Sequence, residues 1–363
     1  MDTGHFEFSP DYAVPPGETL LEVLEEREMS QAELARRTDL SAKHINQIVK
    51  GHVPLSPDVA LRLDRVTGVP ARLWLNLEGK YRERLARSAD TAVLESDLSM
   101  LDELPIQAMV KLGILTKYLN RVDRLREVLR FFGVANRQAW VERSDGLRAS
   151  FRMSSAYESN LAAVSVWLRM GEIEAAAVRC APWDPAAFRR VLEDVRSLTR
   201  EKDPRVWQPE MERLCAGAGV AVVAVPEVTG ARTNGAARWL TPYKGLIQLS
   251  IRGRWSDIFW FSFFHEARHI LDQTKRSIFL SGRSPNASDE RKADRFASDT
   301  LIPPRRAPEL GRLRSLDEAE TFARSIGVHP GIVVGRLQHE RLWRHDQGNR
   351  LRQRLQFVDP EHR

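Results

Sequence analysis

Two histidines and a glutamate stand at a spacing that suits metal chemistry. His265, Glu266 and His269 form the pattern His-Glu-x-x-His within residues 256–272. Positions four apart on an α-helix lie on one face, one turn above each other, so both imidazoles can reach a single ion while Glu266 is displaced around the helix. The spacing therefore predicts a zinc site with a carboxylate base beside it.

A second stretch can complete this site. A catalytic zinc takes three protein ligands and keeps its fourth position for water. Glu290 follows His269 by 21 residues, in the first turn of a helix that Ser288 is expected to cap, and Asp294 lies one turn later. Glu290 can supply the third ligand, and Asp294 can orient a ligand histidine through its other ring nitrogen.

These residue types suit hydrolysis. Zinc lowers the pKa of its bound water, Glu266 takes the proton, the hydroxide attacks a peptide carbonyl, and Glu266 returns the proton to the leaving amine. Arg238, Tyr243 and His329 are candidates for stabilising the oxyanion, and no spacing argument selects one of them. A zinc site without turnover is the alternative, but a structural zinc has four protein ligands and no need for Glu266.

The elements around the motif should shield it and hold it against a small sheet. Ser256 is expected to cap the metal helix, which carries a wide apolar surround that includes Trp260 and Phe264. Before it, residues 220–226 are rich in β-formers. Residues 236–240 and 246–251, joined by a turn, are typical of an antiparallel pair.

Residues 1–80 have the capping pattern of a helix-turn-helix. Ser30 and Ser41 precede two short helical stretches, 31–38 and 42–49, and Gly51 ends the second. In the second helix, outward-facing Asn and Gln side chains can bond adenine and a Lys can reach guanine or phosphate. We assign DNA contact to Gln31, Ser41, Lys43, His44, Asn46 and Gln47.

Residues 29–51 and 60–78, with the helix before them, resemble the Xre-type DNA-binding domain of HigA-like antitoxins over about residues 10–82. Asp39 departs from the glycine usual in this turn, although Asp tolerates the left-handed conformation better than most residues. The resemblance implies binding to operator-like double-stranded DNA. A homodimer is expected because one copy with few basic residues would bind DNA only modestly. A helix-turn-helix that only mediates dimerisation or protein contact is the alternative.

The motif His265–His269, followed by Glu290–Ala297 and Leu301–Pro304, resembles the ImmA/IrrE family of zinc metallopeptidases over about residues 130–305. The resemblance implies an α+β, zincin-like fold of the gluzincin type. It also implies Zn²⁺ bound by His265, His269 and Glu290, with Glu266 as the base. Cleavage of a specific protein, a repressor or a toxin–antitoxin component, is the activity that follows.

The chain of 363 residues, 42% of them apolar, is long enough for two or three domains. We predict a multidomain protein with an all-α helix-turn-helix domain, a helical middle segment and an α+β domain that holds a small antiparallel sheet. The expected bounds are 1–82 for the DNA-binding domain, 83–200 for the helical accessory region, 201–345 for the metallopeptidase and 346–363 for a basic, solvated C-terminal tail.

Cysteine content and hydropathy bear on the compartment. Two cysteines, Cys180 and Cys215, allow neither a disulfide framework nor a Cys-based zinc finger, which fits a reducing cytosol. The sequence has no run of about 18 apolar residues and no signal pattern at Met1. A cytoplasmic protein with no membrane partner is therefore expected. The net charge of +6 suggests an anionic partner, but within residues 1–80 acids outnumber bases.

Two functions of different classes remain. In the first, a DNA-binding regulator carries a zinc-dependent endopeptidase that cleaves a specific protein. In the second, a non-catalytic, antitoxin-like transcriptional regulator uses its zinc domain to sense a metal or a partner.

Overall fold

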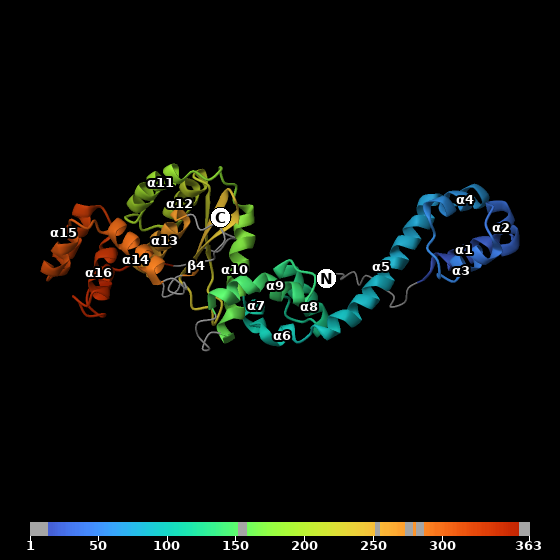
Figure 1. Cartoon of the computed structure of the whole chain (residues 1–363), viewed down its shortest axis with the longest axis horizontal. Helices are drawn as coiled ribbons and strands as arrows, with labels where there is room; N and C mark the ends of the chain where they lie inside the picture. Colours follow the sequence, from blue (N-terminus) through green and yellow to red (C-terminus); the bar gives the residue numbers. More distant parts are fainter. Residues whose placement is uncertain (1–13, 152–157, 251–254, 273–278, 281–286, 356–363) are drawn as a thin grey trace, which may run out of the picture. The chain divides into compact units, whose positions relative to one another are not determined.

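The fold was determined as a computed structural model that describes residues 14–151, 158–250, 255–272, 279–280 and 287–355. The chain divides into two compact units, Met1–Asp97 and Leu98–Arg363, called here the N-terminal and C-terminal units (Figure 1). The predicted boundary at residue 82 falls inside one helix, because α5 runs from Ala71 to Ser96 without a break.

The N-terminal unit is helical, as predicted. Its described part contains α1 Pro16–Glu26, α2 Gln31–Thr38, α3 Ala42–Val49, α4 Pro57–Thr67 and α5. The hydroxyls of Ser30 and Ser41 accept hydrogen bonds from the backbone N–H groups three residues later, so both predicted caps are confirmed. Leu34, Ile45, Leu63 and Trp74 are fully buried and form the centre of this unit's core.

The turn between α2 and α3 tolerates Asp39 in the position usually given to glycine. Asp39 adopts a left-handed conformation with φ of 56°. Arg62 of α4 stabilises this turn, because its Nη1 donates to the carbonyl oxygens of Thr38 and Asp39 at 3.1 and 3.2 Å. The turn therefore keeps its shape without a glycine.

The C-terminal unit begins with helices and continues as an α+β arrangement. The described helices before the sheet are α6 Met100–Glu103, α7 Ile106–Lys111, α8 Arg121–Phe132, α9 Arg137–Phe151, α10 Glu158–Ala177, α11 Pro185–Leu198 and α12 Pro204–Gly217. The strands are β1 Val220–Val225, β2 Gly235–Thr241, β3 Lys244–Ser250 and β4 Phe279–Leu280. The later helices are α13 Ser256–Leu271, α14 Ala287–Leu301, η3 Ala307–Arg312, α15 Leu316–Ile326, α16 Pro330–His339 and η4 Asn349–Leu351. Within the described ranges, no helix has both the length and the hydrophobicity that a membrane crossing requires.

The sheet is mixed, whereas the sequence predicted an antiparallel one. The expected antiparallel pairing of β2 with β3 is present, and β4 also pairs with β2 in the antiparallel sense. However, β1 pairs with β3 in the parallel sense, which gives the order β1-β3-β2-β4. After β1, the chain forms β2 two positions away in the sheet. It then turns back, so β3 lies between β1 and β2 and runs in the same direction as β1.

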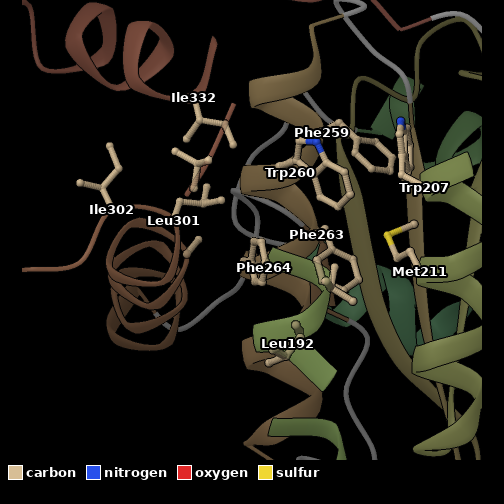
Figure 2. Packing of buried hydrophobic residues seen from close by; sticks show 14 of the residues in the cluster. Leu192, Trp207, Met211, Phe259, Trp260, Phe263, Phe264, Leu301, Ile302 and Ile332 are labelled. Carbon is tan, nitrogen blue, oxygen red and sulfur yellow. The ribbon is translucent and has the colours of Figure 1, made fainter. Parts of the chain in front are cut away.

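Helices cover both faces of this sheet. On one face, Ile247 and Leu249 of β3 join the core that α13 forms with α11 and α12. Figure 2 shows part of this core, in which the ring centroid of Trp207 lies 5.1 Å from Phe259 and 5.0 Å from Trp260. On the other face, the amide of Gln248 donates to the carbonyl of Trp167 in α10. Because α10 and α12 contact the sheet and α11 packs against α12 in the same core, the predicted boundary at residue 200 is not a division between compact units.

The C-terminal segment is packed, which corrects the prediction of a solvated tail over residues 346–363. Arg352 forms a bidentate ion pair with Asp257 in the first turn of α13, at 3.0 and 2.8 Å, and both side chains are nearly buried. Leu355 is buried in the core, and Arg354 pairs with Trp255 as a β-bridge. The sequence predicts a solvated tail because this segment is rich in arginine, a composition that gives no sign of its contacts with the core. Residues 356–363 of the predicted tail lie outside the described residues.

Candidate metal centre and nucleic-acid interface

Helix α13 presents His265 and His269 in a buried environment. Their spacing of four residues places both imidazoles on one face of the helix, and each is at most 3% exposed. The two Nε2 atoms lie 3.2 Å apart. Phe264 and Ile270, also on α13, are buried in the core and fix the helix against the sheet. The two side chains therefore point to one place.

Helix α14 brings Glu290 to the same place. Its Oε2 lies 3.4 Å from His265 Nε2, and its Oε1 lies 3.4 Å from His269 Nε2. Ala293 and Ala297 on α14 are fully buried, and their small side chains allow close packing of α14 against α13. The ligand atoms of the three residues all lie within 4.8 Å of one another. The three side chains that were predicted from the sequence to be metal ligands therefore lie together in the structure.

The distances within this group fit a tetrahedral ion. Zinc bonds to imidazole nitrogen and carboxylate oxygen are about 2.0–2.1 Å long, so neighbouring ligands in a tetrahedron lie about 3.3–3.4 Å apart. The three distances among His265, His269 and Glu290 are 3.2, 3.4 and 3.4 Å. Two nitrogens and one carboxylate are a donor set that zinc accepts. The residues present therefore fit the metal that the motif suggests.

Asp294 holds His265 from the far side of its ring. The Oδ1 atom of Asp294, one turn after Glu290 on α14, lies 2.9 Å from His265 Nδ1. A proton shared in this contact leaves the Nε2 lone pair directed towards His269 and Glu290, as a metal ligand requires. The predicted orienting role of Asp294 agrees with this geometry.

The charges in this group perturb two pKa values. Burial opposes protonation of His265, but the hydrogen bond to Glu290 and the charges of Glu266, Glu290 and Asp294 outweigh it and raise its pKa to about 9. Burial likewise favours the neutral form of Glu290, yet its contacts with His265 and His269 lower its pKa to about 2. Without a metal, a proton on His265 therefore balances the carboxylates.

Glu266 is fully buried and lies against the first residue of β2. A Cβ atom at Gly235 would stand 2.8 Å from both Cγ and Oε1 of Glu266, closer than such atoms approach. A larger residue at position 235 would therefore require the Glu266 side chain or β2 to move. Sequence reasoning missed Gly235, although a glycine immediately before a predicted strand is a signal of close backbone approach.

The structure gives two of the three oxyanion candidates other partners. Arg238 is buried on the α10 side of β2, where its Nη1 pairs with Glu172 at 3.0 Å. His329 caps α16, since its Nδ1 accepts a hydrogen bond from the backbone N–H of Gly331 at 3.1 Å. Tyr243 is exposed in the turn between β2 and β3, at the opposite end of β2 from Gly235. The described contacts place none of the three at the histidines.

In the N-terminal unit, α3 has one buried and one open face. Ile45 and Ile48 are buried, Lys43 and Asn46 are exposed, and His44 and Gln47 are half-buried, as the helix pattern predicted. The remaining two predicted contacts lie at helix starts. The Ser41 hydroxyl accepts a hydrogen bond from His44 N, and Gln31 is the half-buried first residue of α2.

Comparisons with known proteins support a helix-turn-helix in the N-terminal unit. A family model described as helix-turn-helix matches residues 20–74. The uncharacterized HTH-type transcriptional regulator YddM of Escherichia coli is 30% identical over 92 residues, which are 25% of this chain and 92% of YddM. Virulence-associated protein I of Dichelobacter nodosus is 37% identical over 75 residues, 20% of this chain and 69% of that protein.

Solved structures also match about a quarter of the chain. The Pseudomonas aeruginosa antitoxin HigA with the higBA promoter is 36% identical and covers 24% of this chain and 95% of its own, with a TM-score of 0.23. An addiction module antidote protein of the HigA family from Coxiella burnetii is 28% identical, covers 23% of this chain and 94% of its own, and has a TM-score of 0.22.

Proposed function

The chain belongs to the helix-turn-helix family through its N-terminal unit, and from this premise we propose a function in two parts. The N-terminal unit binds operator-like double-stranded DNA through α3. The C-terminal unit is a zinc-dependent endopeptidase that cleaves a specific protein, either a repressor or a toxin–antitoxin component.

The peptidase proposal depends on one observation above all. His265, His269 and Glu290 converge from two helices at distances that suit zinc, and the carboxylate of Glu266 is buried beside them. Zinc bound in such a site lowers the pKa of a water and polarises a carbonyl oxygen. Three protein ligands leave a fourth position open, which is the arrangement of catalytic zinc sites.

Each residue at the proposed site has its own role. The two histidines and Glu290 hold the ion, and Asp294 fixes the ring of His265 through Nδ1. Glu266 accepts the proton of the attacking water and later returns it to the leaving amine. Gly235 keeps β2 close to Glu266, so the carboxylate has a defined position.

The proposed protease is tested by replacing Glu266 alone. Glu266→Gln should retain zinc, measured by elemental analysis, and should abolish the fragments that wild type produces in a proteomic comparison of the native cell. Glu193→Gln, an exposed change on α11, is the matched control. If wild type and Glu266→Gln give the same fragments of other cellular proteins and the same fragments of the chain itself, the chain is not a peptidase. A zinc-dependent change in DNA binding would then favour the non-catalytic regulator.

The DNA proposal is supported by the open face of α3. Lys43 and Asn46 are exposed there. In protein–DNA complexes, lysine side chains contact phosphates and asparagine side chains contact base edges in the major groove. One unit with few basic residues binds DNA weakly, so we propose a homodimer that spans two half-sites.

A mobility-shift assay on the chain's own promoter tests this part. Asn46→Ala combined with Gln47→Ala should abolish the shift, while Asn76→Ala on the exposed face of α5 should preserve it. No shift by the wild-type protein at low salt would overturn the operator proposal.

A further inference from the structure

Three arginines meet at one carboxylate on the α10 side of the sheet. Glu172 of α10 contacts each of them, at 2.9 Å for Arg143 of α9, 2.7 Å for Arg169 of α10 and 3.0 Å for Arg238 of β2. These four residues are called here the arginine cluster. Successive side chains of a strand point to opposite faces, and Ala237 belongs to the core with α13, so Arg238 lies on the other face of β2. The cluster is therefore separate from the metal group.

The arginine cluster holds more positive than negative charge. Among the described residues, Glu172 is the only acidic group that contacts the three arginines. Their other acceptors are neutral, since Arg169 Nε donates to the Phe131 carbonyl at 2.7 Å and Arg238 Nη2 donates to the Leu168 carbonyl. Two positive charges of the cluster are thus without a partner.

Arg238 is the most deeply buried of the three arginines. Its side chain is 7% exposed, and within the described ranges its Nε has no hydrogen-bond partner. Burial lowers the pKa of Arg238 to about 10, and repulsion by Arg143 and Arg169 acts in the same direction, although Glu172 opposes it. Buried charges are stable when they are paired and hydrogen-bonded. A further negatively charged acceptor would therefore stabilise the cluster.

The cluster is open to solvent at Arg143 and Arg169. Their side chains are 50% and 24% exposed, so an ion can approach them from the surface. Arg143 uses only Nη2 within the cluster, and its Nε and Nη1 have no partner in the part of the chain that the structure describes. Guanidinium N–H groups match the oxygens of a carboxylate or a phosphate in pairs. The open side of the cluster therefore suits one of these two anions.

The missing charge decides between them. A carboxylate supplies one negative charge, whereas a phosphate monoester carries about 1.5 to 2 negative charges at pH 7. We propose that the arginine cluster binds a phosphate monoester group, held by Arg143 and Arg169, with Arg238 supplying positive charge from within the fold. Phosphate esters of small molecules and phosphorylated side chains both carry this group. The proposed site requires neither the zinc nor α3.

Calorimetric titration of the full chain with inorganic phosphate tests the site. Wild type should bind phosphate at pH 7.5 and constant ionic strength. Arg143→Gln and Arg169→Gln should each raise the Kd about tenfold or more, because each removes a charge-assisted hydrogen bond. Arg179→Gln, an exposed change just after α10, is the matched control and should leave the Kd unchanged. Equal Kd values for wild type and the two cluster variants would overturn the proposal, as would the absence of phosphate binding by wild type.

Glu172→Gln should change the Kd in the opposite direction. It removes the negative charge that competes with the ligand, so phosphate should bind more tightly than it binds wild type. This variant covers the case in which an arginine variant does not fold, and a Kd that rises in Glu172→Gln would contradict the proposed charge balance. Titrations with ribose 5-phosphate and with a phosphoserine tetrapeptide distinguish the two sources of the phosphate group, because the natural source should be the tighter ligand.

Discussion

Asp294 Oδ1 lies 2.9 Å from His265 Nδ1, on the side of the imidazole ring that faces away from His269. The contact joins the two helices of the proposed metal site through a ligand's back side. It therefore sets both the orientation of the His265 ring and which of its nitrogens carries the proton.

Loss of this carboxylate should weaken metal binding more than it weakens the fold. Asp294 is half exposed, so Asp294→Ala leaves no large cavity. We expect zinc affinity to fall by roughly 10–100-fold, the usual effect of removing such a partner. Competition with a chromophoric chelator measures this, with Asp299→Ala as control. An unchanged affinity would show that His265 is positioned without Asp294.

A methyl group at position 235 should separate catalysis from metal binding. Gly235→Ala places a Cβ 2.8 Å from the Glu266 carboxylate, so the side chain or β2 must move. Cleavage should fall at least tenfold through kcat with zinc content unchanged, because Glu266 is not a predicted ligand. Gly217→Ala, whose Cβ would meet nothing within 4 Å, is the control. Retained kcat in Gly235→Ala would show that the position of Glu266 is not critical.

The sequence predicted which side chains converge better than it predicted the elements around them. His265 and His269 share a helix, so their convergence follows from helical geometry alone. The grouping of Glu290 with Asp294 could also be predicted from the sequence, because their one-turn spacing on a second helix places them on the same face. What spacing could not show is the approach of Gly235 to Glu266, since it depends on how β2 packs against α13.

Long-range pairing explains the errors in the fold. The antiparallel β2–β3 pair is joined by a short turn and was predictable, whereas the parallel partner β1 joins through contacts distant in sequence. Arg352 and Leu355 were assigned to a solvated tail because local composition is basic. Asp257, the partner of Arg352, lies 95 residues earlier in the chain, and no local pattern reveals this pairing.

Two side chains of α3 should affect DNA binding differently. Lys43 is exposed and suited to phosphate, so Lys43→Ala should weaken binding to all sequences and reduce the salt dependence of log Kd by about one unit. Asn46→Ala should cost about 1–3 kcal/mol on the operator only and leave the salt slope unchanged. Mobility shifts on operator and random DNA across salt concentrations measure both. Identical behaviour of the two variants would contradict base reading by Asn46.

The C-terminal segment should stabilise the start of α13. Arg352→Ala leaves Asp257 buried without its bidentate partner, which typically costs about 3–5 kcal/mol. A large decrease in the urea midpoint is expected, and Arg350→Ala, an exposed change two residues away, should have little effect. Because Asp257 is the orphaned charge, adding Asp257→Leu should restore part of the lost stability. Equal midpoints for Arg352→Ala and wild type would contradict a packed C-terminal segment.

A carboxylate shared by three arginines should make stability depend on pH. Glu172 on α10 contacts Arg143, Arg169 and Arg238 at 2.9, 2.7 and 3.0 Å. Burial favours the neutral form of Glu172, but the arginines outweigh it and lower its pKa below the ordinary 4.5. A lowered folded-state pKa contributes stability that is complete above 4.5 and disappears as the pH falls through the folded-state value.

Glu172→Gln removes this contribution and leaves three arginines without their common partner. At pH 7 we expect a loss of about 2 kcal/mol in the free energy of unfolding, because hydrogen bonds to a charged group are lost. The difference between variant and wild type should shrink as the pH falls below 4.5, because Glu172 of the unfolded chain then becomes neutral, and it should disappear once the pH passes below the lowered folded-state pKa. Melting temperatures at pH 7 and pH 4 measure it, with exposed Glu174→Gln as control. A difference that stays constant or grows on acidification would show that the arginines do not stabilise the ionised form of Glu172.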